Sequence, residues 1–184
     1  MSPEGPSGSG VTEGWIDGVR RVLSPNCDAR PAREVSVIVI HGISLPEGHF
    51  GSDYVAHLFT NQLDTARVSF ADLDGVRVSS HLLLRRDGEI VQFVGFDERA
   101  WHAGASTYQG RERCNDFAIG IELEGTDRTP YRDEQYVALV RVCKLLMSAY
   151  DIDARDIVGH ADIAPGRKTD PGPAFDWKRL KESL

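Results

Sequence analysis

Cysteine is scarce in this sequence, and its pattern excludes a disulfide framework. The 184 residues include three cysteines, Cys27, Cys114 and Cys143, and no CxxC pair occurs. Small domains stabilised by disulfides have an even number of cysteines at characteristic spacings. We therefore expect reduced thiols, as in a cytosolic protein.

Long apolar runs and an excess of basic residues are also absent. The longest aliphatic run covers residues 35–40, far below the ~20 residues of a membrane span. The start, MSPEGPSGSG, lacks the basic and apolar regions of a secretory signal. The 21 Lys and Arg are outnumbered by 28 Asp and Glu, a net charge of −7, which disfavours binding to a phosphate backbone. We expect a cytoplasmic protein that binds neither membrane nor nucleic acid, and the sequence indicates no oligomeric state.

The length and composition predict one folded domain. Hydrophobic residues make up 41% of the chain and charged residues 27%, as in ordinary globular proteins. Residues 1–12 are rich in Gly, Ser and Pro and are expected to form a flexible tail. Residues 13–184 are expected to form the single domain.

Hydrophobic patterning predicts an α/β fold with a mixed central β-sheet flanked by α-helices. A β-branched, almost wholly apolar run predicts a buried strand that ends at His41, and an Asp-Gly pair at 87–88 predicts a hairpin turn. An apolar stripe at three- and four-residue spacing predicts a helix at 133–150. The predicted strands are 35–40, 78–84, 90–94 and 117–123; a helix is expected at 54–63, a loop at 161–175, and a short helix after Asp176.

Two of the six histidines occupy positions suited to metal binding. His41 follows the buried strand, and His160 opens a polar loop that also contains Lys168 and Asp170. Catalytic zinc commonly has three protein ligands and keeps a fourth position for water. His41, His160 and Asp170 can supply such a set, although spacing alone leaves the alternatives of hydrogen-bonded imidazoles and a turn aspartate before Pro171.

Three separated stretches strengthen this interpretation. They are IHGISLPEGHFG at 40–51, WHAGASTYQGRERCNDFAIGIELEGTD at 101–127 and GHADIAPGRKTDPGPAFDW at 159–177. In this order they closely resemble the zinc amidases of the amidase type 2 family, which share a fold with peptidoglycan recognition proteins. The resemblance implies hydrolysis of the amide between 1,6-anhydro-N-acetylmuramic acid and the L-alanine of the stem peptide, on small cytoplasmic muropeptides, during peptidoglycan recycling.

The same resemblance implies roles for five residues. Zn²⁺ is bound by His41, His160 and Asp170, Glu122 is the acid/base residue, and Lys168 stabilises the oxyanion. A carboxylate can move a proton from water to a leaving amine, and an ammonium favours charge on a carbonyl oxygen. The structural alternatives are a solvent-facing strand residue for Glu122 and a solvated loop residue for Lys168.

Three further residues are candidates for substrate contact. Trp101 can stack on the substrate or belong to the core. Arg77 and Arg113 match family positions where arginines hold carboxylates, and either can instead be a surface residue. Gly42 departs from the Asn common in the family, which puts fine substrate anchoring in doubt and leaves the metal ligands intact.

Three alternative functions stay open at this point. An amidase of the same family can act on intact peptidoglycan, although such enzymes are usually exported or encoded by phages. A muropeptide-binding module would not cut its ligand, but modules of this kind typically lack a complete ligand set. A thiol mechanism at Cys114 would need a nearby base or a helix N-terminus, and neither is evident from the sequence.

Overall fold

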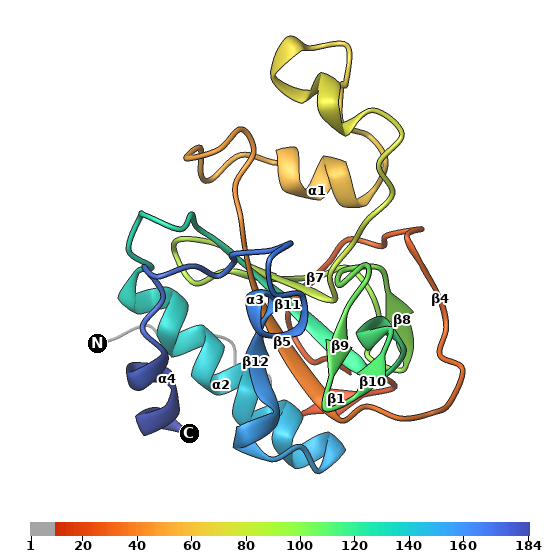
Figure 1. Cartoon of the computed structure of the whole chain (residues 1–184), viewed down its shortest axis with the longest axis vertical. Helices are drawn as coiled ribbons and strands as arrows, with labels where there is room; N and C mark the ends of the chain where they lie inside the picture. Colours follow the sequence, from red (N-terminus) through yellow and green to blue (C-terminus); the bar gives the residue numbers. More distant parts are fainter. Residues whose placement is uncertain (1–9) are drawn as a thin grey trace.

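A computed structural model describes residues 10–184, and its centre is a six-stranded mixed sheet (Figure 1). The strands of this sheet lie in the order β12–β5–β11–β6–β7–β3. Neighbours pair in parallel except at the β6–β7 hairpin, which is antiparallel. The bounds are β12 Ile157–Gly159, β5 Val37–Ile43, β11 Ala118–Glu124, β6 Leu82–Leu84, β7 Ile90–Gln92 and β3 Arg20–Arg21. The predicted mixed sheet is confirmed.

Shorter elements surround this sheet. Three two-stranded ribbons pair β1 with β2, β4 with β8 and β9 with β10. Within the described residues the α-helices are α1 Tyr54–Phe59, α2 Asp133–Tyr150, α3 His160–Ile163 and α4 Trp177–Ser183, and the 3₁₀ turns are η1 Val68–Leu73, η2 Cys114–Asp116 and η3 Ala154–Asp156. The ribbon strands are β1 Val11–Thr12, β2 Trp15–Ile16, β4 Cys27–Ala29, β8 Glu98–Ala100, β9 Thr107–Tyr108 and β10 Arg111–Glu112.

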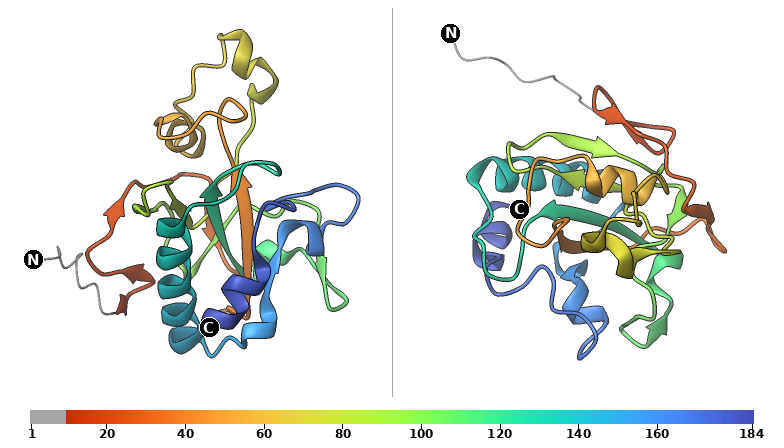
Figure 2. Two further views of the ribbon diagram at one scale, coloured as in Figure 1. Left: turned by 90° about the vertical axis from the view of Figure 1, so that its left-hand side faces the viewer. Right: turned by 90° about the horizontal axis from the view of Figure 1, so that it is seen from above.

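The two faces of the sheet are covered by different helices (Figure 2). Side chains alternate along a strand, so successive residues of β5 point to opposite faces of the sheet. Ile38 and Ile40 belong to the core cluster that contains the buried residues of α2. Val37 and Val39 belong to a second cluster that includes Ile163 of α3. His41 therefore lies on the face covered by α3.

The long helix α2 has the bounds that its apolar stripe predicts. Its buried side chains include Tyr136, Leu139, Cys143 and Leu146. Gln135 is a buried polar exception, and its amide donates to the carbonyls of Leu84 and Glu124. No helix in residues 10–184 has both the length and the apolar character that crossing a membrane requires.

Several predicted boundaries are wrong. Strand β5 continues beyond His41 to Ile43, because it stays paired with β11 up to Glu124. The short helix α3 lies where a loop was expected, and helix α1 ends at Phe59 rather than at residue 63. Residues 78–81 form no strand.

The expected tail is only partly covered by the structure. Residues 1–9 lie outside the described part, and residues 11–12 already form strand β1, which pairs with β2. The tail and the domain boundary at residue 13 stay predictions.

Candidate metal and catalytic site

The candidate site lies at the carboxyl ends of three adjacent parallel strands. The register aligns Glu122 of β11 directly with His41 of β5. On the other side of β5, strand β12 ends at Gly159, and His160 follows it as the first residue of α3. Parallel strands end at one edge of a sheet, where open α/β sheets commonly bind ligands. Residues more than a hundred positions apart therefore meet at one point.

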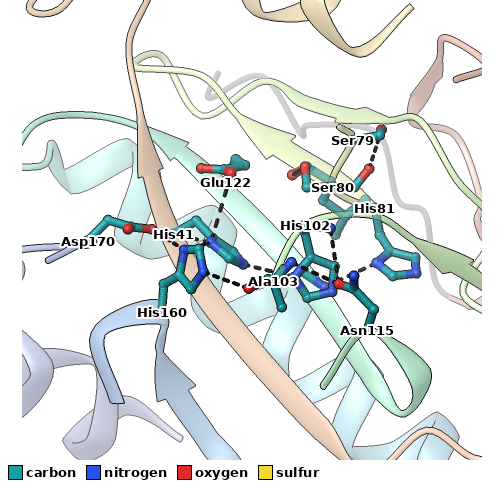
Figure 3. A network of polar contacts seen from close by, with 12 residues as sticks. His41, Ser79, Ser80, His81, His102, Ala103, Asn115, Glu122, His160 and Asp170 are labelled. Carbon is teal, nitrogen blue, oxygen red and sulfur yellow. Dashed lines mark hydrogen bonds and ion pairs between the residues drawn. The ribbon is translucent and has the colours of Figure 1, made fainter. Parts of the chain in front are cut away.

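Three side chains converge there (Figure 3). The Nδ1 atoms of His41 and His160 lie 2.9 Å apart. Asp170 Oδ2 lies 3.2 Å from the first of these atoms and 3.1 Å from the second. All three candidate ligand atoms are within 4.8 Å of one another, so they can hold a metal ion. Two imidazoles and one carboxylate form a donor set that suits zinc.

The surroundings of His160 favour its use as a ligand. Its Nε2 atom lies 3.2 Å from the carbonyl oxygen of Ala103, which can only accept a hydrogen bond. The proton of a neutral ring is therefore on Nε2, and Nδ1 keeps a lone pair toward the other ligands. A backbone carbonyl that accepts a hydrogen bond from the outer nitrogen of a metal-binding histidine commonly fixes its tautomer and orientation in this way.

The protonation of the other two residues also fits a metal. Burial lowers the pKa of His41 to about 4, so its imidazole is neutral near pH 7. Burial opposes ionisation of Asp170, but its close polar contacts with the rings of His160 and His41 outweigh it and hold the pKa of this carboxyl well below its usual range. The cluster thus offers a neutral imidazole at His41 and an ionised carboxylate at Asp170.

Glu122 lies beside the cluster with an unsatisfied oxygen. Its Oε1 atom is 4.0 Å from Nδ1 of His41, and its Oε2 atom is buried without a hydrogen-bond partner among the described residues. Burial, and next the negative charge of Asp170, raise the pKa of Glu122 well above its ordinary value. A buried carboxyl group with a raised pKa and a free oxygen is suited to accept and release a proton.

The face of β11 that carries Ala118, Gly120 and Glu122 is only partly open. At Gly120, an added Cβ would lie 2.5 Å from Cγ of His102, so the His102 ring already fills the space over this residue. Glu122, one step further along the same face, borders a cavity instead. The small residue therefore accommodates a histidine, and only the carboxylate has room beside it.

This cavity has a volume of about 190 Å³ and brings further predicted residues together. Trp101 and Lys168 line it together with Glu122 and two of the candidate ligands, His160 and Asp170. A second cavity of about 410 Å³ shares Gly42, Ile43, Lys168 and Asp170 with the first. The two adjoin, which gives an extended ligand room to lie across the site.

The two predicted arginines line other cavities. Arg77 borders a cavity beside Leu63 and Leu73, and its guanidinium donates to the carbonyl of Val76. Arg113 borders yet another cavity and forms an ion pair with Asp116 at 3.3 Å. Their role in binding substrate stays a prediction.

Cys114 lies in an unsuitable place for a nucleophile. Its side chain is buried in the cluster with Val37 and Val39, and burial raises the pKa of its thiol. A thiol mechanism needs the opposite shift of the thiol pKa.

Near the site, the hydroxyl of Tyr131 donates to the carbonyl of Pro171, the residue after Asp170. The same hydroxyl leaves no room for a side chain at Gly42.

Two contributors to the site are given no role by the sequence pattern. Nδ1 of His102 lies 3.0 Å from Nε2 of His41. The side-chain oxygen of Asn115 accepts hydrogen bonds from the backbone N–H groups of His102 and Ala103. Position next to Trp101 singles out His102, but only the fold reveals its contact with a candidate ligand.

Comparison with known proteins agrees with this geometry. The sequence pattern of the N-acetylmuramoyl-L-alanine amidase family, Amidase_2, matches residues 31–173. The chain belongs to this family. It is 57% identical over 173 residues to the 1,6-anhydro-N-acetylmuramyl-L-alanine amidase AmpD of Escherichia coli K12, with 93% of this chain and 94% of the relative covered.

Solved structures give the same result. The crystal structure of a selenomethionine derivative of AmpD matches with a TM-score of 0.92 and 54% identity, and covers 95% of this chain and 98% of that one. The amidase AmiD of E. coli, solved with anhydro-N-acetylmuramic acid-L-Ala-D-γ-Glu-L-Lys, matches with a TM-score of 0.63 and 34% identity, and covers 85% and 60%. The fold predicted from the sequence is thereby confirmed.

Proposed function

We propose that this protein is a zinc-dependent amidase that cleaves 1,6-anhydro-N-acetylmuramic acid from the L-alanine of the stem peptide during peptidoglycan recycling. The observation that supports it most directly is the convergence of His41, His160 and Asp170 beside a carboxyl oxygen of Glu122 that has no hydrogen-bond partner within residues 10–184. The names of two relatives that are 57% and 56% identical to this chain support the substrate class. When bound, zinc supplies Lewis-acid chemistry, which polarises a carbonyl and lowers the pKa of water.

The side chains around the cluster divide the remaining work. Glu122 removes a proton from the attacking water and delivers it to the amine nitrogen when the C–N bond breaks. Lys168 lines the same cavity, and its ammonium stabilises the negative charge that develops on the carbonyl oxygen. Trp101 borders the cavity and can hold the sugar by stacking.

Incubation with purified anhydromuropeptide, followed by mass spectrometry, tests this function. We expect the free stem peptide and the free anhydro sugar in equal amounts, each produced only when zinc is present. Intact sacculi should be cleaved more slowly than the soluble fragment. Faster cleavage of sacculi would reassign the enzyme to intact peptidoglycan, and tight binding without cleavage would make it a muropeptide-binding module.

The cellular setting belongs to the same proposal. We infer that the enzyme acts in the cytoplasm on a small muropeptide and needs neither membrane nor nucleic acid. Fractionation of cells that express the natural protein should place it in the cytoplasmic fraction. Recovery in the periplasm would favour a role on intact peptidoglycan instead.

A further inference from the structure

A buried histidine behind the proposed ligands has no role in the mechanism above. The ring of His102 lies over Gly120 of β11. A side chain at position 120 would collide with this ring. Its Nδ1 atom lies 3.0 Å from Nε2 of His41, on the side of that ring that faces away from His160 and Asp170 (Figure 3). Its other nitrogen, Nε2, is buried and has no partner among the described residues.

We propose that His102 is a positioning residue that fixes the tautomer and ring orientation of His41. This inference rests on the proposed zinc site. A neutral His41 can bind a metal through Nδ1 only when the ring proton is on Nε2, and Nδ1 of His102 faces this position at 3.0 Å, where it can accept that proton's hydrogen bond. The reverse arrangement, with His102 donating, would leave the proton on Nδ1 and block the ligand atom.

One short backbone segment serves both histidine ligands. His102 contacts His41, and the carbonyl of the next residue, Ala103, lies 3.2 Å from Nε2 of His160. The side-chain oxygen of Asn115 accepts the N–H of His102 at 3.1 Å and the N–H of Ala103 at 2.8 Å. The contact of His102 with His41 and the contact of Ala103 with His160 therefore both depend on a segment that the side-chain amide of Asn115 holds in place.

His81 supports the ring of His102 from behind. The two rings lie in an edge arrangement with their centroids 5.7 Å apart. Nδ1 of His81 accepts the backbone N–H of Gly120 at 3.1 Å, and its Nε2 lies 3.0 Å from the carbonyl of Glu98. The ring nitrogens of His81 are thus engaged by the backbone and by Arg30, whose Nη2 lies 3.2 Å from Nε2 of His81. His102 is the side chain that contacts Nε2 of His41.

Two substitutions of His102 separate positioning from packing. His102→Asn keeps an acceptor near the place of Nδ1, whereas His102→Phe keeps the ring but has no acceptor. We expect His102→Phe to weaken zinc binding about 10–100-fold, the range typical when a residue that orients a metal ligand is lost. We expect His102→Asn to weaken it by no more than about threefold. Competition with a chromophoric chelator measures the zinc dissociation constant, with thermal melting of the metal-free proteins as a control for folding.

The results distinguish this inference from the proposed function. Zinc binding by the natural sequence tests the site itself. If that protein binds zinc and His102→Phe binds it equally well, or if both variants lose affinity equally, the positioning role is wrong while the site remains.

A measurement on the natural sequence covers the case in which His102→Phe does not fold. In zinc-loaded, ¹⁵N-labelled protein, the proton of His41 should be on Nε2, with a through-hydrogen-bond N–N coupling to Nδ1 of His102. Absence of this coupling in a protein with resolved histidine signals would overturn the inference.

Discussion

At the scale of single residues, the three proposed ligands should be individually required. His41→Ala, His160→Ala and Asp170→Ala each remove one of three converging donor atoms, so each variant should lose bound zinc and turnover. His57→Ala, an exposed histidine of α1, is the matched control and should keep both. Elemental analysis after gel filtration measures the zinc content. Full stoichiometric zinc in any of the three variants would remove that residue from the ligand set.

Glu122 should affect the chemistry without affecting the metal. Glu122→Gln keeps the shape of the side chain but cannot accept a proton, so turnover should fall by about 10²–10⁴-fold with zinc retained. Glu182→Gln, an exposed carboxylate in α4, should change neither quantity. Steady-state rates and zinc content for both variants test this assignment. Turnover near that of the natural protein would mean that another group moves the proton.

The raised pKa of Glu122 also predicts how stability depends on pH. In the metal-free protein, the folded state holds a proton that the unfolded chain releases above the ordinary pKa of 4.5. The free energy of unfolding therefore falls as the pH rises from about 4.5 through the raised pKa. Glu122→Gln is neutral throughout and avoids this loss, so it should melt above the parent protein at pH ~7 and close to it at pH ~4. An identical pH dependence of both metal-free proteins would contradict the burial of a neutral carboxyl.

The residues of the site differ in how far the sequence could predict them. The stretches around His41, Glu122 and Asp170 predict a role for each of these residues, because they resemble those of the amidase type 2 family. His102 could not be assigned, since its partner is 61 residues away and the contact exists only in the fold. For Arg77, the residue type predicts a possible role in binding carboxylates, but it does not determine which cavity the side chain borders.

At the scale of elements, how well a helix or strand is predicted depends on its length and on whether its hydrogen-bond partners are near or distant in the sequence. Helix α2 repeats its apolar stripe over 18 residues, which is long enough to determine its bounds. The strand pairs β1–β2 and β9–β10 contain two residues per strand, too few to show any period. The last residues of β5 are strand only because β11 pairs with them, a long-range effect that local pattern does not contain.

Helix α2 stabilises the fold from the face opposite the site. Leu139→Ala removes a fully buried side chain of the main core and should lower the free energy of unfolding by about 2–5 kcal/mol. Val137→Ala, on the same helix but 69% exposed, should change it by less than about 0.5 kcal/mol. Urea denaturation measures both, and zinc affinity should be unchanged in the folded variants. A loss of zinc affinity in Leu139→Ala would show that the two faces of the sheet are coupled.

At the scale of the whole molecule, zinc should act as a clamp between distant parts of the chain. The proposed ligands belong to β5, to α3 and to the loop after α3, with separations of 119 and 129 residues from His41. Because an unfolded chain does not hold these three groups together, zinc binds the folded state preferentially. At a free zinc concentration 100 times the dissociation constant, the stabilisation is about 2.7 kcal/mol.

This clamp predicts a thermal shift that depends on zinc concentration. For a chain of this size, about 2–4 °C per kcal/mol converts the stabilisation into a rise in Tm of roughly 5–11 °C. Zinc that binds to Cys and His side chains in the unfolded chain would reduce this rise, so the comparison with Asp170→Ala is essential. That variant keeps every Cys and His but lacks one ligand, and its Tm should rise far less across the same zinc titration. Equal shifts in the two proteins would place the stabilising zinc somewhere other than at the carboxyl ends of β5, β11 and β12.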